Sequence, residues 1–155
     1  MKVTLLCMGD KMPSWVSQGV AEYAKRLTHD MVFEIKELNL SKRSKSNAAS
    51  ILKRECQQML KHLSNKDHVV ALDVLGKSYS TPKLAKRLAS WRELSRPVTF
   101  CIGGPEGLHP DVLERADEKI SLSELTMPHP LVRIVFVEQL YRAMSVLNNH
   151  PYHRQ

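Results

Sequence analysis

Short apolar runs alternate with longer segments in which apolar residues recur every three or four positions, and this alternation constrains the fold more than any other feature. The apolar runs, which predict strands, are Lys2–Met8, Met31–Leu38, His68–Val74 and Val98–Ile102. The periodic segments, which predict helices, are Ser14–Leu27, Ala48–Leu63 and Thr81–Leu94. Alternating strands and helices are typical of α/β proteins, so we expect a mostly parallel sheet with helices on both faces.

Shorter elements and one loop complete the chain. Ser14 and Thr81 carry hydroxyls that can cap the helices beginning there. The polar and basic stretch Ser41–Asn47 predicts a loop. After the fourth strand we expect a short helix at Asp111–Ala116 and a short strand at Lys119–Leu122.

The final helical segment, Leu131–Leu147, is apolar at nearly every angle around its axis. A helix of this kind is buried on more than one side. In a chain of 155 residues, a second subunit is the simplest cover for the outer side, so we expect a homodimer.

Length and composition fit a single domain over residues 1–155. With 43% apolar and 25% charged residues, the chain has the composition of a soluble globular protein, which excludes a disordered one. No run approaches the roughly 20 apolar residues of a membrane span. Val3–Met8 is too short for a signal-peptide core. We therefore expect a cytoplasmic protein that does not associate with a membrane.

Cysteine and histidine spacing indicates neither a disulfide framework nor a metal site. Cys7, Cys56 and Cys101 lie far apart and form no CxxC pair. Cys7 and Cys101 stand inside apolar runs, where a buried, inert thiol is typical. The seven histidines show no zinc-type spacing, so we expect no metal.

The basic surplus is concentrated in one stretch. The chain carries 23 Lys and Arg against 16 Asp and Glu, a formal net charge of +7. Lys42–Lys61 holds six basic residues against Glu55 alone, whereas Asp111–Glu124 is net acidic. A basic block of this kind points to a polyanion such as nucleic acid, and a solvated helix face explains it equally well.

Three expected loops follow strands, at the edge where open parallel sheets bind ligands. They are Asp73–Ser78, Gly103–Pro110 and Ser121–Pro128. Gly103 and Gly104 would let a ligand approach backbone amides closely. The hydroxyl and apolar side chains of Ser121–Pro128 could line an adenine pocket. The sequence contains neither a P-loop nor GxGxxG, and ordinary turns stay open as the alternative for these loops.

A family resemblance rests on four motifs in a fixed order: GGPEGL at 103–108, SLSELTMPHPLVR at 121–133, EQLYRA at 138–143 and NHPYHR at 149–154. Together with CMGDKMPSWV near the N-terminus, they cover essentially the whole chain. With these motifs the sequence resembles the ribosomal RNA large subunit methyltransferase H family of SPOUT-class enzymes.

The resemblance implies a SPOUT-type fold with a C-terminal trefoil knot and a homodimeric enzyme that uses S-adenosylmethionine as methyl donor. The family methylates N3 of pseudouridine 1915 in helix 69 of bacterial 23S rRNA, acting on assembled 70S ribosomes. By position, its cofactor contacts fall on Leu72, Gly103, Gly104, Leu122, Ser123, Glu124, Leu125, Thr126 and Met127.

Methyl transfer to a uracil N3 needs no metal, but it needs alignment, removal of the N3 proton and a cation near the developing anion. The candidate side chains lie near the C-terminus: His129, Arg133, Glu138, Arg142, His150, Tyr152, His153 and Arg154. Within this set we predict catalytic roles for His129, Arg142, Tyr152, His153 and Arg154.

Structural roles compete for several of these residues. Glu138 and Arg142, four residues apart, can form an ion pair within the helix. Arg133 can be a buried partner across the dimer. His129, between two prolines, can shape the start of the helix.

The tail Asn149–Gln155 has residue types suited to stacking on and hydrogen-bonding an RNA base. We expect Tyr152, His153 and Arg154 to close over the target base, at a site that also uses the other subunit.

Two other functions stay open from the sequence. One is a non-enzymatic RNA-binding or ribosome-associated dimer. The other is an α/β enzyme with a different nucleotide, such as a hydride-transfer cofactor, although the missing GxGxxG counts against it. Because the chain has no room for a separate RNA-binding module, we expect it to recognise a large assembled substrate, with Lys42–Lys61 and the dimer surface meeting phosphates.

Overall fold

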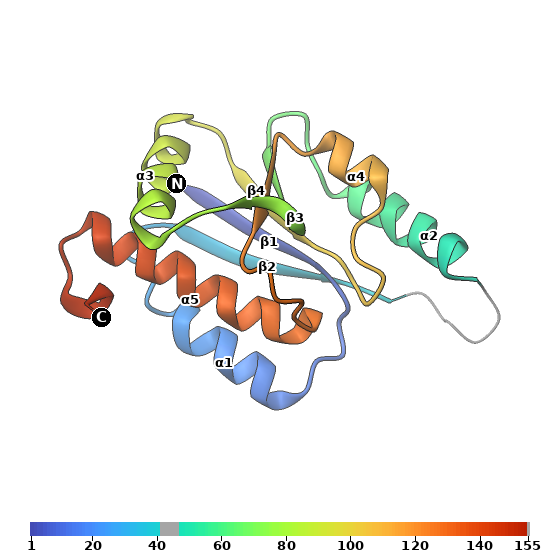
Figure 1. The fold of residues 1–155 in the computed structure, drawn as a ribbon, viewed down its shortest axis with the longest axis horizontal. Coiled ribbons are helices and arrows are strands. Elements are labelled where there is room, and N and C mark those ends of the chain that lie inside the picture. Colours follow the sequence, from blue (N-terminus) through green and yellow to red (C-terminus); the bar gives the residue numbers. More distant parts are fainter. Residues whose placement is uncertain (41–46, 155) are drawn as a thin grey trace.

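The computed structural model describes residues 1–40 and 47–154 (Figure 1). Five strands alternate with five helices, and a short 3-10 helix ends the described chain. In chain order the elements are β1 (Lys2–Met8), α1 (Ser14–Ala24), β2 (Val32–Leu38), α2 (Ala48–Lys61), β3 (His68–Ser78), α3 (Thr81–Glu93), β4 (Val98–Ile102), α4 (Pro110–Arg115), β5 (Glu118–Ser121), α5 (His129–Leu147) and η1 (Pro151–His153). The predicted alternation is confirmed, but the predicted loop Ser41–Asn47 falls almost wholly outside the described residues.

The five strands form one parallel sheet in the order β2-β1-β4-β3-β5. Every pairing is parallel, so the carboxyl ends of the strands share one edge. The predicted α/β class is therefore confirmed. The trefoil knot that the resemblance implies stays a prediction.

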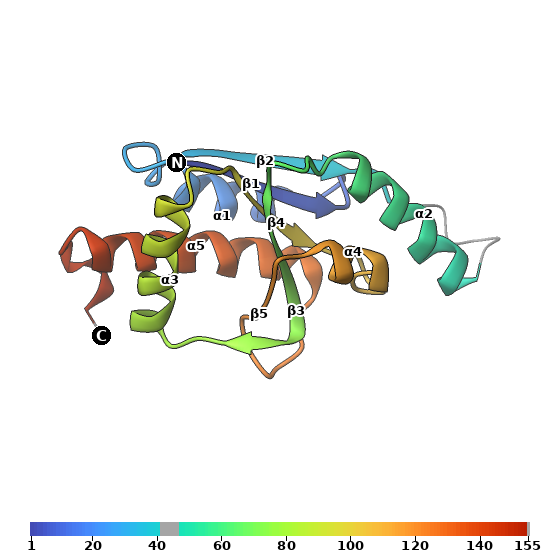
Figure 2. The same ribbon diagram turned by 90° about the horizontal axis from the view of Figure 1, so that it is seen from above.

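Helices cover both faces of the sheet, as predicted (Figures 1 and 2). Side chains of β1 alternate between the two layers because successive residues of a strand point to opposite faces. Leu5 and Cys7 belong to the larger core beneath α1, α3 and α5, whereas Leu6 and Met8 belong to the smaller core beneath α2 and α4. This burial of β1 on both faces explains its continuous apolar run.

Strand β3 is longer than the sequence predicted and carries a correction. Asp73–Ser78, expected as a loop, forms the second half of the strand. The pairing with β5 shifts register between Leu72 and Lys77, so the strand bends and then pairs again. At Gly76 an added Cβ would lie 2.6 Å from the backbone nitrogen of Ile120, so only glycine fits this close approach.

Two predicted caps are wrong. Ser14 and Thr81 are the first helical residues of α1 and α3, whose N-caps are Pro13 and Ser80, with no side-chain cap hydrogen bond. Helix α1 also ends at Ala24 instead of Leu27.

Helix α5 lies in the middle of one helical layer, in contact with α1 and α3. These two helices cover part of the apolar surface of α5 that we expected a second subunit to cover. Leu131, in the first turn, is still 36% exposed. The homodimer therefore stays a prediction, with a smaller apolar surface in its favour than the sequence indicated.

The predicted burial of Cys7 and Cys101 is confirmed, and Cys56 is buried as well. Desolvation raises the pKa of Cys7 and Cys101 to about 12, which keeps both thiols protonated and unreactive at neutral pH. In the described part of the chain, no helix combines the length and the apolar character that a membrane crossing requires.

Candidate functional site

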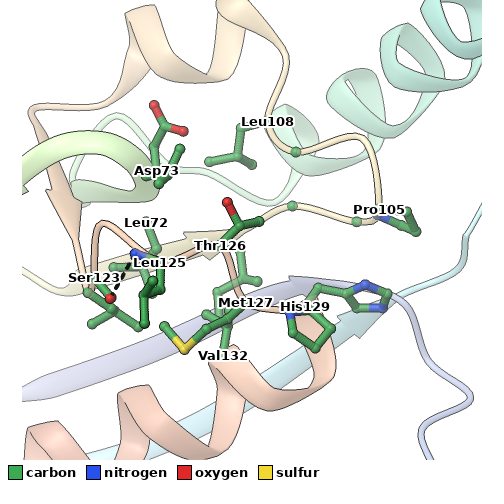
Figure 3. Close-up of a pocket in the computed structure, with 17 residues that line it drawn as sticks. Leu72, Asp73, Pro105, Leu108, Ser123, Leu125, Thr126, Met127, His129 and Val132 are labelled. Carbon is green, nitrogen blue, oxygen red and sulfur yellow. Dashed lines mark hydrogen bonds between the residues drawn. The ribbon is translucent and has the colours of Figure 1, made fainter.

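A cavity of about 440 Å³ opens at the carboxyl edge of the sheet. Its walls come from the middle of β3, where the strand bends, the end of β4, the loop after β4, the loop after β5 and the first turn of α5 (Figure 3). Open α/β sheets bind ligands at this edge, and the volume suits a small-molecule cofactor.

The walls combine apolar side chains with a few polar groups. Leu72, Met127 and Val132 supply apolar surface, while Asp73 and Thr126 bring a carboxylate and a hydroxyl (Figure 3). This composition is typical of a pocket that encloses a mainly apolar ring system and orients it by a small number of hydrogen bonds.

The loop after β4 is a tight glycine turn. The backbone N–H of Gly107 donates to the carbonyl of Gly104 at 2.9 Å, and Gly107 has a positive φ of 79°. An added Cβ at Gly103 would overlap the backbone of Gly107. These glycines let backbone, in place of side chains, form this wall of the cavity.

The loop after β5 is held by hydroxyls. Ser121 Oγ donates to the carbonyl of Ser123 at 2.9 Å. Ser123 Oγ accepts from the backbone N–H of Leu125 at 3.0 Å (Figure 3). Within residues 1–40 and 47–154, no protein acceptor takes the backbone N–H of Thr126 or Met127. Both residues line the cavity, so their backbone N–H groups are available as donors to a ligand.

The cavity brings together nearly all the cofactor residues predicted from the resemblance. Those that line it are Leu72, Gly103, Gly104, Leu122, Ser123, Leu125, Thr126 and Met127. Glu124 does not line it and is exposed. Asp73 and Leu108 also line it: neither was among the predicted cofactor residues, although both fall in loops expected to bind a ligand, Asp73–Ser78 and Gly103–Pro110.

The predicted catalytic residues do not meet in one chain. His129 lines the cavity, but Arg142, Tyr152, His153 and Arg154 do not. Instead Tyr152 contacts Glu138, which lies nine residues after His129 along α5. At 1.5 Å and 100° per residue, this places the tail contact about 14 Å along the helix and on its opposite side. The active site predicted from the sequence is thus divided within this chain.

His129 is the first residue of α5. An added Cβ at Gly9 would lie 3.6 Å from His129 Nε2, which places the ring near the end of β1, and the imidazole turns away from Met127 (Figure 3). This orientation favours the structural role at the helix start, and the catalytic role stays a prediction.

Glu138 and Arg142 form the predicted intrahelical ion pair. The same carboxylate also accepts the hydroxyl of Tyr152 at 3.0 Å. The pair is therefore part of the tail's binding site on α5, which periodicity could not show.

Arg133 is 1% exposed, and its partners are in its own chain. Its guanidinium donates to Glu37 at 2.7 Å and to the carbonyl of Gly9 at 2.7 Å. It therefore ties α5 to the ends of β1 and β2, so these contacts favour a structural role within one protomer over a role across a dimer.

One group of potential metal ligands lies beside the glycine turn. Ligand atoms of Cys56, His109 and Asp111 lie within 4.8 Å of one another. His109 Nδ1, however, accepts the backbone N–H of Asp111 at 3.0 Å and so caps α4. This nitrogen is already used, and the absence of a metal stays a prediction.

Comparison with known proteins agrees with these features. A family model described as "Predicted SPOUT methyltransferase" matches residues 1–153. Three relatives named "Ribosomal RNA large subunit methyltransferase H" are 51%, 48% and 45% identical, from Saccharophagus degradans, Pseudomonas fluorescens and a Marinomonas species. Each match covers 99% of this chain and 100% of the relative.

A solved structure, a probable methylase family protein from Haemophilus influenzae, has the same fold at 12% identity, with a TM-score of 0.54. The match covers 99% of this chain and 70% of that one. The family model and the relatives confirm the resemblance that the motifs indicated, and the chain belongs to the SPOUT methyltransferase family.

Proposed function

We propose that this protein transfers a methyl group from S-adenosylmethionine to large-subunit ribosomal RNA, at N3 of pseudouridine 1915 in helix 69 of assembled 70S ribosomes. One observation carries the proposal: all the cofactor residues expected from the resemblance except Glu124 line a single cavity. The names of the relatives support the substrate class.

The donor groups of the cavity fit this cofactor. Apolar walls and the backbone N–H groups of Thr126 and Met127 suit an adenine ring, which presents nitrogen acceptors at its edge. The carboxylate of Asp73 suits hydroxyl or ammonium groups. When bound, the cofactor supplies an electrophilic methyl group on a sulfonium.

The tail supplies the groups expected to act on the RNA base. N3 of the uracil ring must lose its proton, and a cation close by stabilises the anion that develops. His153 can hydrogen-bond the ring, and Arg154 can provide the charge. His153 Nδ1 is buried with no partner among the described residues, as expected of a group that a second component completes.

Separation of tail and cavity supports a site built from two protomers. Tyr152 binds to Glu138, whereas α5 lines the cavity with residues of its first turn, such as His129. In a two-fold dimer, an element of one copy can meet a different element of the other. We propose that the tail of one protomer closes over the cavity of its partner.

The charge of the chain suits RNA. The net charge of +7 favours association with phosphates, and Lys53 of α2 is exposed. Lys42, Arg43 and Lys45, expected to contact RNA, lie outside the described residues. These contacts stay a proposal.

The decisive experiment incubates the protein with 70S ribosomes and isotopically labelled S-adenosylmethionine, followed by mass spectrometry of helix 69. We expect one labelled methyl group on the target pseudouridine, and none when separated 50S subunits replace the ribosomes. Label on a different RNA would overturn the substrate assignment. Failure of calorimetry to detect cofactor binding would overturn the proposed activity.

A further inference from the structure

The C-terminal tail is a folded element. Asn149 has a positive φ of 53°, which reverses the chain after α5. The backbone N–H of His150 then donates to the carbonyl of Ser145 at 2.9 Å. Pro151–His153 forms a 3-10 turn with His150 at its N-cap. The last described residues are thus fixed against α5, whereas chain ends commonly fray.

The ring of Tyr152 lies close to two guanidinium groups and a second aromatic ring, which hold the tail in place. Its ring centroid is 5.1 Å from Arg142 and 5.8 Å from Arg26, and 4.5 Å from the ring of Tyr141. Its hydroxyl donates to Glu138, which also accepts from Arg142. Both the ring and the hydroxyl of Tyr152 are therefore used in holding the tail.

Arg26 follows the end of α1, so it reaches this cluster from outside α5 and the tail, together with Tyr23 of α1. Its guanidinium lies 5.2, 5.5 and 5.8 Å from the ring centroids of Tyr23, Tyr141 and Tyr152. Glu22 accepts its Nη2 at 2.7 Å and orients it. Arg26 thus connects the end of α1, the end of α5 and the tail.

An exposed ion pair alone would give Arg26 little importance, because water screens the attraction between its charges. Lys25 shows that case: it pairs with the same Glu22 at 2.6 Å, its side chain is 64% exposed, and it lies over no ring in the described chain. Arg26 is 35% exposed and faces three rings. Its aromatic contacts, more than its ion pair, set it apart.

We propose that Arg26 is a positioning residue for methyl transfer: it holds the ring of Tyr152 and thereby presents His153 and Arg154 to the target base. The inference rests on the proposed function and deepens it. It also divides the roles in the tail, because Tyr152 anchors while the two residues after it face the substrate. The Tyr152 hydroxyl is committed to Glu138, and burial, aided by this hydrogen bond, raises the pKa of Tyr152, so the phenol stays protonated.

The test is a double-mutant cycle of Arg26→Ala, Tyr152→Ala and the double variant, with Lys25→Ala as the matched control. Methyl transfer to 70S ribosomes is measured together with cofactor affinity by calorimetry. We expect Arg26→Ala to lower kcat by about tenfold or more, because the reacting groups lose their alignment. Cofactor affinity should stay unchanged, and Lys25→Ala should behave as wild type. The double variant should be no slower than Tyr152→Ala.

If the loss of kcat in the double variant equals the product of the two single losses, Arg26 does not act through Tyr152. That result would overturn the inference. Wild-type kcat in Arg26→Ala would also overturn it. Arg26→Lys, which keeps a cation beside the rings, should recover part of the lost rate and so exclude misfolding as the cause.

Hydrogen exchange of the tail separates this inference from the proposed function. Residues 149–154 should exchange faster in Arg26→Ala than in Lys25→Ala, whether or not ribosomes are the substrate. Unchanged exchange would overturn the anchoring role. The wild-type protein could be inactive on ribosomes while Arg26→Ala still speeds exchange of the tail. That combination would overturn the proposed function and leave the anchoring role of Arg26 intact.

Discussion

The hydroxyl of Tyr152 donates a hydrogen bond to Glu138 across 14 residues of sequence, at 3.0 Å. Arg142 donates to the same carboxylate, so one acid binds a cation of the helix and a phenol of the tail. Glu138 is therefore the point on α5 where the tail is fixed. Its carboxylate balances the guanidinium of Arg142 beside the Tyr152 ring, while Glu22 pairs with Arg26.

Glu138→Gln should reduce methyl transfer by about tenfold or more, because the tail loses its charged acceptor and Arg142 loses its counter-ion. Steady-state kinetics on ribosomes measures this, with Gln139→Ala as control, since Gln139 contacts the other oxygen of the same carboxylate. Cofactor affinity should not change. A variant with wild-type kcat would show that tail anchoring at Glu138 is irrelevant to catalysis.

Gly103→Ala should abolish measurable cofactor binding, a loss of about a hundredfold or more, because the new methyl group overlaps the backbone of Gly107 and displaces the cavity wall. Gly19→Ala is the matched control: the atoms nearest its added Cβ belong to the flexible side chain of Ile134, between α1 and α5. Both variants should lose some thermal stability. Calorimetry should show cofactor binding for Gly19→Ala alone, and equal affinities would exclude this turn from the cofactor site.

Among the acids that the structure describes, Glu118 has the most strongly lowered pKa. Burial raises its pKa, but hydrogen bonds from Arg87, Trp91 and His68 outweigh this effect and lower the pKa to about 2. A carboxyl whose pKa is lower in the folded state stabilises the fold above its ordinary pKa of about 4.5 and loses that contribution as the pH falls towards 2.

Glu118→Gln should therefore lower the free energy of unfolding by on the order of 3 kcal/mol at pH 7. The difference from wild type should shrink between about pH 4.5 and pH 2, as wild-type Glu118 becomes protonated. Urea unfolding at several pH values measures it, with the exposed Glu114→Gln as control. A difference that does not vary with pH would assign the loss to packing instead of charge.

The strands were predictable from the sequence because a strand that is buried on both faces of the sheet is a continuous run of apolar residues. The bounds of β4 match the prediction at both ends, and those of β1 do as well. The bend of β3 was not predictable, because a register shift depends on the neighbouring strand and leaves no periodicity in the bent strand itself. Leu75, an apolar residue at the bend, is 89% exposed, so apolar character does not indicate burial there.

The sequence predicted which residues belong to the candidate site, but it did not predict how the fold places them relative to one another. The family motifs identified both the cavity residues and the tail residues. Their separation on α5 follows from the fold-back at Asn149, a residue type that tolerates positive φ, but the sequence does not show which part of α5 the reversed tail meets. The partners of Arg133 were hidden as well, since a buried guanidinium can bond carbonyls anywhere in the fold, here those of Met8 and Gly9.

This arrangement predicts complementation between two inactive proteins. One carries Gly103→Ala and lacks a working cavity, and the other is truncated after His150 and lacks Tyr152, His153 and Arg154. If the tail of one protomer acts on the cavity of the other, a mixed dimer contains one site with both parts intact.

Random reassortment of an equimolar mixture makes half the dimers mixed, so about one quarter of the wild-type activity should return. The two proteins are exchanged by mild denaturation and refolding, and light scattering confirms the dimer before methyl transfer is assayed. Each protein refolded alone should stay inactive. No recovery from a mixture that contains mixed dimers would place tail and cavity of the same protomer in one site, which would require the tail to leave Glu138 and swing around α5.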